Sequence, residues 1–181
     1  MSHTTRAPRP AEQDGVDYYF VDRAHFEALR DRGGFAEWAE VHGNLYGTSR
    51  AEIARLHQGG KVALFDIDIV GAHNLWRLYP DEVRLAFLLP PTWQVLVDRL
   101  LKRGTDSEVV VRRRLRTARL ELHGVCASPA PWHIVVNDAL DVAAAQLEGL
   151  LVSPPPPAED PRAHPSVQAF LHDADADPRA A

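Results

Sequence analysis

The sequence predicts an α/β fold, and three short apolar runs carry that prediction. Residues 62–65, 83–89 and 133–137 consist mostly of Val, Leu, Ile, Phe and Ala. Such runs are typical of parallel strands that are covered on both faces. Polar residues or prolines end each run, and patterns with helical spacing separate them, as expected of an open α/β sheet. With 181 residues, of which 45% are hydrophobic, the chain can form one domain with a sizeable core.

The other predicted elements follow from capping residues, glycines and periodicity. Apolar residues at helical spacing predict helices at 23–32, about 49–58, about 93–102, after residue 107 and at 139–151. A short strand over 18–21 should precede the first helix. Alternation puts Tyr18 and Tyr19 on opposite faces of it, so one ring is expected in the core and the other could offer its hydroxyl to a ligand.

The stretch FAEWAEVHGNLYGTSR at 35–50 is dense in hydrogen-bonding side chains. These are Glu37, Trp38, His42, Tyr46, Thr48 and Ser49. Its first part suits a partly buried strand or a short helical turn, the chain must bend after Gly43, and Gly47 permits a close backbone approach. We interpret the stretch as a ligand-contacting loop, with a merely polar turn as the alternative.

Two carboxylates, Asp66 and Asp68, interrupt the first apolar run at its carboxyl end, where open α/β sheets bind ligands. Alternation directs both to the same side of the chain. Because an unpartnered buried pair is costly, the pattern favours a metal, a cation or a ligand donor nearby. The alternative is that the two carboxylates cap the helix that follows.

Arginines gather in two places. Arg6 and Arg9 lie three residues apart in an extended, proline-containing segment, so both guanidiniums can reach one anion; a solvated basic arm is the alternative. Residues 99–119 hold eight Arg or Lys side chains against two acidic ones. This density favours a polyanionic small molecule over a purely solvated face. RNA is disfavoured, because no aromatic residues interleave with the arginines.

Composition narrows the function classes further. The formal net charge of −5 argues against a general nucleic-acid binder. There is no apolar run of membrane-spanning length and no signal peptide at Met1, and the single Cys126 suits a reducing compartment. A cytoplasmic protein without a membrane partner is therefore expected. Residues 153–181, which begin with a proline-rich stretch, are expected to be mostly disordered.

The motifs TTRAPRPAEQDGVDYYFV, EWAEVHGNLYGTS, LFDIDIVGA, RGTDSE…RRRL and VVND, in this order, resemble bacterial guanylate kinase. The resemblance covers residues 2–151 and implies a P-loop kinase-like parallel sheet with helices on both faces. It also implies one domain at 1–152, with a mixed β GMP-binding insert at about 5–50 and a helical lid at about 93–125. The implied reaction in purine nucleotide metabolism transfers the γ-phosphoryl group of ATP, bound with Mg²⁺, to GMP. The oligomeric state stays open.

The resemblance assigns GMP binding to Ser2, Arg6, Arg9, Tyr18, Glu37, Tyr46, Thr48, Asp66 and Asp68. Glu37 would accept the N1 and N2 hydrogens of guanine, which adenine cannot supply, and Ser2 and Thr48 would meet the other polar edge of the base. The two arginines and the two tyrosines would hold the phosphate.

The resemblance further assigns catalysis to Arg103, Arg114 and Asp66, with both arginines neutralising charge during transfer. Arg103 and Asn137 would lie on the ATP side. No residue would bind the metal directly, and Asp66 and Asp68 would lie near its water shell. Val70 stands where the family usually has glutamine.

The sequence GxxGxGK[ST], which holds the ATP phosphates, does not occur in the chain. In this family it lies upstream of the SxTTR segment. Because phosphoryl transfer depends on positioning and electrostatics, the chain as given is expected to be inactive. The family usually has valine where Met1 stands, and the valine codon GTG also starts translation in bacteria. We therefore expect the true reading frame to continue upstream through a strand and this loop.

Three interpretations stay open. The chain is a guanylate kinase that lacks its amino-terminal part, a GMP-binding or protein-interaction module without catalysis, or an α/β remnant without a ligand. The complete set of GMP-site residues and lid arginines favours the first.

Overall fold

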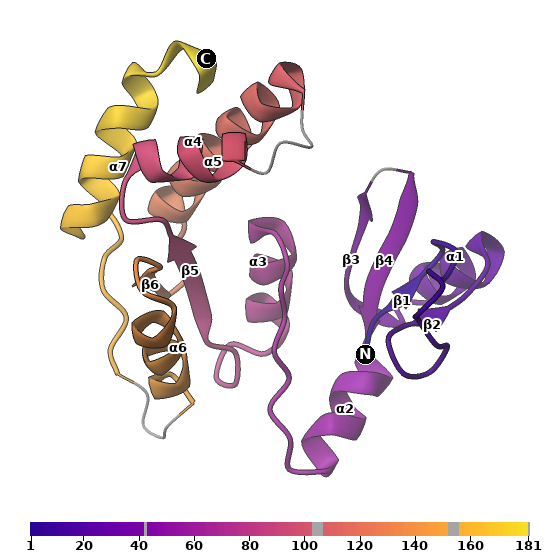
Figure 1. Cartoon of the computed structure of the whole chain (residues 1–181). Helices are drawn as coiled ribbons and strands as arrows, with labels where there is room; N and C mark the ends of the chain where they lie inside the picture. The colour runs from indigo at the N-terminus through magenta and orange to yellow at the C-terminus, as the bar shows by residue number, and fades with distance from the viewer. Residues whose placement is uncertain (42, 103–106, 152–155, 181) are drawn as a thin grey trace. The chain divides into compact units, whose positions relative to one another are not determined.

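The chain forms two compact units, Met1–Val83 and Arg84–Ala181, in a computed structural model (Figure 1). The structure describes residues 1–41, 43–102, 107–151 and 156–180. Both units combine strands with helices, so the predicted α/β class is confirmed. Within these ranges, no helix is long and apolar enough to cross a membrane.

The first unit is built on a four-stranded mixed sheet in the order β2-β1-β4-β3. Its strands are β1 (His3–Thr4), β2 (Tyr19–Phe20), β3 (Phe35–Val41) and β4 (Asn44–Ser49). Strands β1 and β2 are parallel, whereas β4 is antiparallel to both of its neighbours. The bend predicted after Gly43 is the turn of the β3–β4 hairpin, where this glycine has a positive φ of 80°.

The register of the β3–β4 hairpin brings two predicted site residues together, since Glu37 pairs with Thr48. An irregularity in β3 between Phe35 and Glu37 shifts the pairing there. A Cβ atom added to Gly47 would lie 3.0 Å from the backbone oxygen of Glu37 and 3.0 Å from Cβ of Trp38. The close approach predicted for Gly47 is therefore to the neighbouring strand.

Three helices complete the first unit: α1 (Arg23–Asp31), α2 (Arg50–Gln58) and α3 (Ile69–Leu78). Asp22 caps α1 by accepting the His25 backbone N–H at 2.6 Å, and Ser49 caps α2 by accepting that of Glu52 at 3.2 Å. These caps satisfy amides that a helix leaves unpaired at its first turn. The helix starts expected at residues 23 and about 49 are thus close to the observed ones.

The strand predicted at residues 62–65 is not formed, so this prediction was wrong. Residues 61–68 are extended without strand pairing, and Val62 and Leu64 are 70% and 91% exposed. Neither sheet in the described part of the chain includes them. An apolar run becomes a strand only where a neighbouring strand accepts its hydrogen bonds and other elements cover its faces.

The second unit holds a parallel pair, β5 (Leu85–Leu89) and β6 (Trp132–Val136), which confirms two of the predicted strands and their direction. Its helices include α4 (Trp93–Lys102), α5 (Glu108–Ala127) and α6 (Leu140–Gly149). The bounds of α4 match the predicted 93–102, because leucines and valines at helical spacing mark its buried side.

The tail contains ordered structure, which corrects the expectation of disorder over most of 153–181. Helix α7 (Pro165–Ala176) and the short helix η1 (Pro178–Ala180) contact α4 and α5 within this unit (Figure 1). Val167, Phe170 and Ala174 of α7 are at most 2% exposed. Their spacing gives the helix one apolar face, which the average polarity of the tail conceals.

A polar contact holds the end of α7 to the start of α4. The indole Nε1–H of Trp93 donates to Oδ2 of Asp177 at 2.7 Å, and the Arg179 guanidinium contacts the same carboxylate at 2.6 Å. The pKa of Asp177 lies well below its usual range, mainly because of the hydrogen bonds from Arg179 and to a smaller extent because of the one from Trp93. The Trp93 ring also meets Phe170 edge-on at 5.3 Å between centroids. The tail is therefore part of the second unit's core.

Candidate functional site

A cavity of about 350 Å³ lies in the first unit. Its lining comes from one end of the β1–β4 pair, from the residues just before β2, from α2 and from the extended segment before α3: Met1, Ser2, Asp17, Tyr18, Thr48, Leu56 and residues 62–67. Ser2, Tyr18, Thr48 and Asp66, four of the residues predicted to bind GMP, therefore border one space.

Glu37 is the buried carboxylate of this region, with 8% of its surface exposed. Thr48, its partner across the hairpin, hydrogen-bonds to it through both side chain and backbone. The Thr48 hydroxyl in turn lies 2.9 Å from Ser2 Oγ. Glu37, Thr48 and Ser2 thus form a hydrogen-bonded row that runs from β3 across β4 to the residue before β1.

The pKa of Glu37 is raised above its ordinary value, mainly because burial disfavours the charged form. Hydrogen bonds from Thr48 oppose this rise, and the negative charge of Asp68 adds to it. A carboxylate in this state gains from a ligand that brings further hydrogen-bond donors. Such perturbed groups beside a cavity are typical of binding sites.

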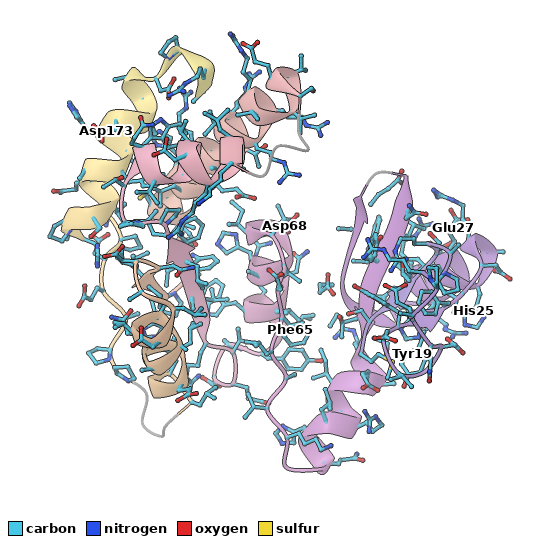
Figure 2. All side chains as sticks on the ribbon, viewed as in Figure 1. Tyr19, His25, Glu27, Phe65, Asp68 and Asp173 are labelled. Atoms are coloured by element: carbon cyan, nitrogen blue, oxygen red, sulfur yellow. The ribbon has the colours of Figure 1, made fainter. Side chains whose placement is uncertain are left out.

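Asp68 and Asp66 have different surroundings. Asp68 accepts the Gly71 backbone N–H at 2.8 Å and caps α3, so the capping alternative holds for this residue. Figure 2 shows Asp68 at the start of α3 and Phe65 on the preceding extended segment. Asp66 is exposed and lines the cavity. Within the described ranges, no group of three or more His, Cys, Asp or Glu is placed to hold a metal ion.

A second cluster gathers around the Arg6 guanidinium. Its Cζ atom lies 5.6 Å from the ring centroid of Tyr18 and 5.9 Å from that of Phe20, so both rings face this guanidinium. Tyr18 meets Tyr46 edge-on at 6.2 Å between centroids. The pKa of Arg6 is raised chiefly by its hydrogen bond to Glu12, with a contribution from Tyr46. Arg6 and both predicted phosphate-binding phenols therefore converge.

Arg9 is placed differently from Arg6, because its side chain is exposed. Its backbone N–H donates to Glu12 Oε2 at 2.7 Å. Sequence reasoning overlooked Glu12. The available signal was an acidic residue following two arginines at spacings of six and three, within reach of both.

Glu52 was also overlooked. It is 4% exposed and accepts hydrogen bonds from Arg55 at 2.7 and 2.9 Å and from the Tyr19 hydroxyl at 3.4 Å; the Met1 amino group lies 3.1 Å away. Arg55 is the main reason that its pKa falls to about 2. The pattern Ser49-x-x-Glu52 is a helix-start signature and could have identified it. Of the two neighbouring tyrosines, Tyr19 hydrogen-bonds to Glu52 and Tyr18 borders the cavity.

The arginines of α5 in the second unit have different surroundings. Arg112 contacts Glu108 at 2.8 Å, and Arg119 lies 3.7 Å from Asp175 of α7. Arg114 is exposed and borders a groove of about 260 Å³ between α4 and α5. Intramolecular ion pairs thus account for part of the arginine density that suggested a polyanionic ligand.

Asn137 follows β6 and is fixed by its backbone. Its N–H donates to the Leu89 carbonyl at 2.7 Å, and its own carbonyl accepts from Arg99 Nη2 at 3.0 Å. Two other residues that the sequence singled out, Arg103 and His42, lie outside the described residues.

The two clusters of the first unit have complementary chemistry. Glu37, Thr48 and Ser2 offer a carboxylate and two hydroxyls to a flat polar group with adjacent N–H donors. Arg6, with Tyr18 and Tyr46, offers a forked cation and two phenols to an oxyanion. Tyr18 belongs to the second cluster and borders the same cavity as Ser2 and Thr48. A ligand with such a polar group at one end and an anion at the other fits this arrangement.

Comparisons with known proteins agree with these features. The guanylate kinase family model matches residues 1–153. Guanylate kinase from Corynebacterium efficiens is 43% identical over 154 residues, covering 84% of this chain and 79% of that protein. Guanylate kinase from Nocardia farcinica is 46% identical over 155 residues, covering 84% and 78%. The crystal structure of guanylate kinase from Anaplasma phagocytophilum superposes with a TM-score of 0.63 at 28% identity, covering 99% of this chain and 84% of that one. The chain belongs to the guanylate kinase family.

Proposed function

We propose that the first unit binds GMP, with guanine beside Glu37, Thr48 and Ser2 and the phosphate beside Arg6 and Arg9. The observation that carries this proposal is the state of Glu37. It is almost fully buried, its pKa is raised by burial, and its hydrogen bonds come from Thr48 within the hairpin. A ligand that donates two further hydrogen bonds would offset the desolvation of the carboxylate.

Base selectivity follows from the same residue. Guanine presents N1–H and N2–H as adjacent donors, whereas adenine presents an unprotonated ring nitrogen and a C–H group at the corresponding edge. With adenine, a buried carboxylate would face no donor, and each unmatched buried polar group costs about 1–3 kcal/mol. We therefore expect at least about ten-fold tighter binding of GMP than of AMP.

The proposed reaction is ATP-dependent phosphorylation of GMP. Arg114 and Arg103 would contact the phosphates and neutralise charge that develops during transfer. Asp66 and Asp68 would accept hydrogen bonds from the water shell of the Mg²⁺ that accompanies ATP, which supplies further charge neutralisation. Asn137 would lie on the adenine side.

GMP binding without phosphoryl transfer is the second candidate, because the 181 residues contain no GxxGxGK[ST] sequence. A polypeptide of these residues is expected to bind GMP and to form no measurable GDP from GMP and ATP. Adding a strand and a loop of this pattern upstream, in frame, should restore GDP formation. Rapid GDP formation by the unextended polypeptide would contradict this view of the ATP site.

Calorimetric titration with GMP and AMP tests the binding proposal. The Glu37→Gln variant should lose about ten-fold or more in GMP affinity, since it replaces an acceptor of both guanine donors by an amide. Glu40→Gln is the matched control. Glu40 lies on the same strand, but its side chain is 53% exposed and its carboxylate pairs with Arg23 at 3.7 Å. Equal affinities for GMP and AMP, or equal effects of the two substitutions, would overturn the assignment.

The catalytic role of Arg114 is tested in the polypeptide that carries the added upstream strand and loop. Arg114→Ala should lower turnover by a larger factor than it lowers GMP affinity, since the guanidinium would act on charge that appears during transfer. Arg112→Ala is the control, because it removes the same charge from the same helix and Arg112 does not line the groove that Arg114 borders. Equal losses of turnover in the two variants would remove Arg114 from the proposed mechanism.

A further inference from the structure

Glu12 closes a tight turn that begins at Arg9. Its backbone N–H donates to the Arg9 carbonyl at 2.9 Å, and its carboxylate Oε2 accepts the Arg9 N–H at 2.7 Å. The two bonds run in opposite directions across the same four residues. The turn is therefore fixed by both the backbone and the side chain of Glu12.

The other carboxylate oxygen of Glu12 holds Arg6. Arg6 Nη2 donates to Oε1 at 2.8 Å, while Nη1 donates to the Ala7 carbonyl at 2.8 Å. The side chains of Arg6 and Glu12 are 18% and 17% exposed. With the rings of Tyr18 and Phe20 beside it, the guanidinium is held in one orientation. The guanidinium also hydrogen-bonds to Tyr46, and those of its five N–H groups that are not engaged in these bonds can meet an anion.

From this geometry we infer that Glu12 is a positioning residue for the phosphate of GMP. It does not touch the ligand. It fixes the Arg6 guanidinium and the Arg9 backbone in the arrangement that receives the phosphate, so that less conformational freedom is lost on binding. This inference rests on the proposed function of the first unit.

Two opposite effects meet at Glu12. Its negative charge repels a phosphate, whereas its two hydrogen bonds preorganise the phosphate-binding arginines. Arg6 already neutralises the Glu12 carboxylate at 2.8 Å, and the side chain of Arg9 extends into solvent as a second cation. Repulsion is therefore largely compensated. When Glu12 is absent, nothing offsets the added rotational freedom of the Arg6 side chain. The loss of positioning should therefore outweigh the loss of repulsion.

The test compares GMP with guanosine in the full chain, using NMR titration to reach weak affinities. Glu12→Ala should weaken GMP binding by about three- to ten-fold, the range expected for loss of one preorganised side chain, and leave guanosine binding within about two-fold. Glu12→Gln keeps one carbonyl oxygen and should give an intermediate loss. Glu27→Ala is the control, because Glu27 lies on α1 (Figure 2) and pairs with a different arginine, Arg23, at 3.3 Å.

The variants also distinguish positioning from a general structural role. In a double-mutant cycle, Glu12→Ala should have little further effect on GMP affinity once Arg6 is replaced by Ala. Equal weakening of GMP and guanosine binding would show that Glu12 supports the fold alone. Tighter GMP binding by Glu12→Ala would show that repulsion dominates. Either result overturns the inference.

Failure of the proposed function gives a different result. If the unsubstituted chain binds GMP no better than guanosine, its phosphate contacts are absent and the proposed GMP site is wrong. If it prefers GMP and Glu12→Ala retains the full preference, the GMP site stands and only the positioning role of Glu12 is overturned.

Discussion

The two units bury different kinds of side chain. The buried polar and charged residues of the described chain all lie in the first unit: Thr4, Glu37, Thr48, Ser49 and Glu52. The second unit instead has a large apolar cluster, to which β5, α4, α5, α7 and η1 all contribute. The apolar cluster of the first unit is smaller, and its buried members are Phe26, Phe35 and Leu45.

This difference indicates a division of labour. Buried polar groups cost free energy unless every one of them is hydrogen-bonded, and they define geometry when they are. Glu37 and Thr48 in the first unit are arranged in this way beside a cavity. Apolar packing in the second unit contributes stability without selecting a ligand. Substitutions in the two units should therefore have different consequences.

The largest effect is expected from Phe170→Ala in the second unit. Phe170 is 2% exposed and packs against Trp93, so its removal should lower the free energy of unfolding by about 3–5 kcal/mol. Urea unfolding, followed by amide hydrogen exchange in each unit, measures this loss. Leu140→Ala is the control, because Leu140 is 79% exposed. A loss below about 1 kcal/mol would show that α7 is not part of the core.

Next is Glu52→Gln in the first unit, which should cost about 1–3 kcal/mol by removing the charge-assisted hydrogen bonds that the buried Glu52 carboxylate accepts from the more exposed Arg55. Because the pKa of Glu52 is about 2, below its ordinary 4.5, the charged carboxylate stabilises the folded state above pH 4.5. This contribution should disappear as the pH falls from 4.5 to 2. Unfolding measured across this range checks it; an unchanged pH dependence in Glu52→Gln would contradict it.

The pH dependence of stability that Glu37 causes should have the opposite sign to that of Glu52. Its pKa is raised in the folded protein, so its contribution to stability is fully present at low pH and decreases as the pH rises through the shifted pKa. GMP binding, which needs the carboxylate, should become tighter over the same interval, by up to about ten-fold per pH unit. Titrations from pH 4 to 7 with Glu37→Gln alongside would show this. A pH profile that the substitution does not alter would exclude Glu37 as its origin.

The smallest effect is expected on the surface of α5. Arg112 and Glu108 form an exposed pair one helical turn apart, so Arg112→Gln should change the free energy of unfolding by less than about 0.5 kcal/mol. Thermal unfolding at low and high salt is sufficient to measure this. A change above 1 kcal/mol would mean that exposed arginines, and not the apolar face, hold α5 in place.

Local sequence patterns predicted the elements whose stability is local. The bounds of α4, the starts of α1 and α2 and the bend after Gly43 follow from side-chain spacing, from short polar side chains before a helix and from a glycine that accepts a positive φ. Two predictions failed where distant residues decide. Residues 62–65 lack a neighbouring strand in the described chain, and α7 is ordered by a core that its own composition does not reveal.

The site was predictable to a similar degree. Glu37, Tyr46 and Thr48 stood out because one short stretch holds them, and strand pairing then puts Glu37 opposite Thr48. Glu12 and Glu52 were overlooked because their importance lies in partners, Arg6 and Arg55, that only the folded chain identifies. Residue type indicates which groups can bind a ligand. The groups that hold them in place emerge only from the three-dimensional contacts.

The most direct test of this account is hydrogen–deuterium exchange of the full chain with and without GMP. We expect the largest slowing of exchange in the first unit, at residues 2–6 and along β3 and β4, with much less in α7. The Glu37→Gln variant should reduce this slowing at the same GMP concentration. Slowing confined to the second unit, with unchanged exchange in the β3–β4 hairpin, would contradict the placement of the GMP site.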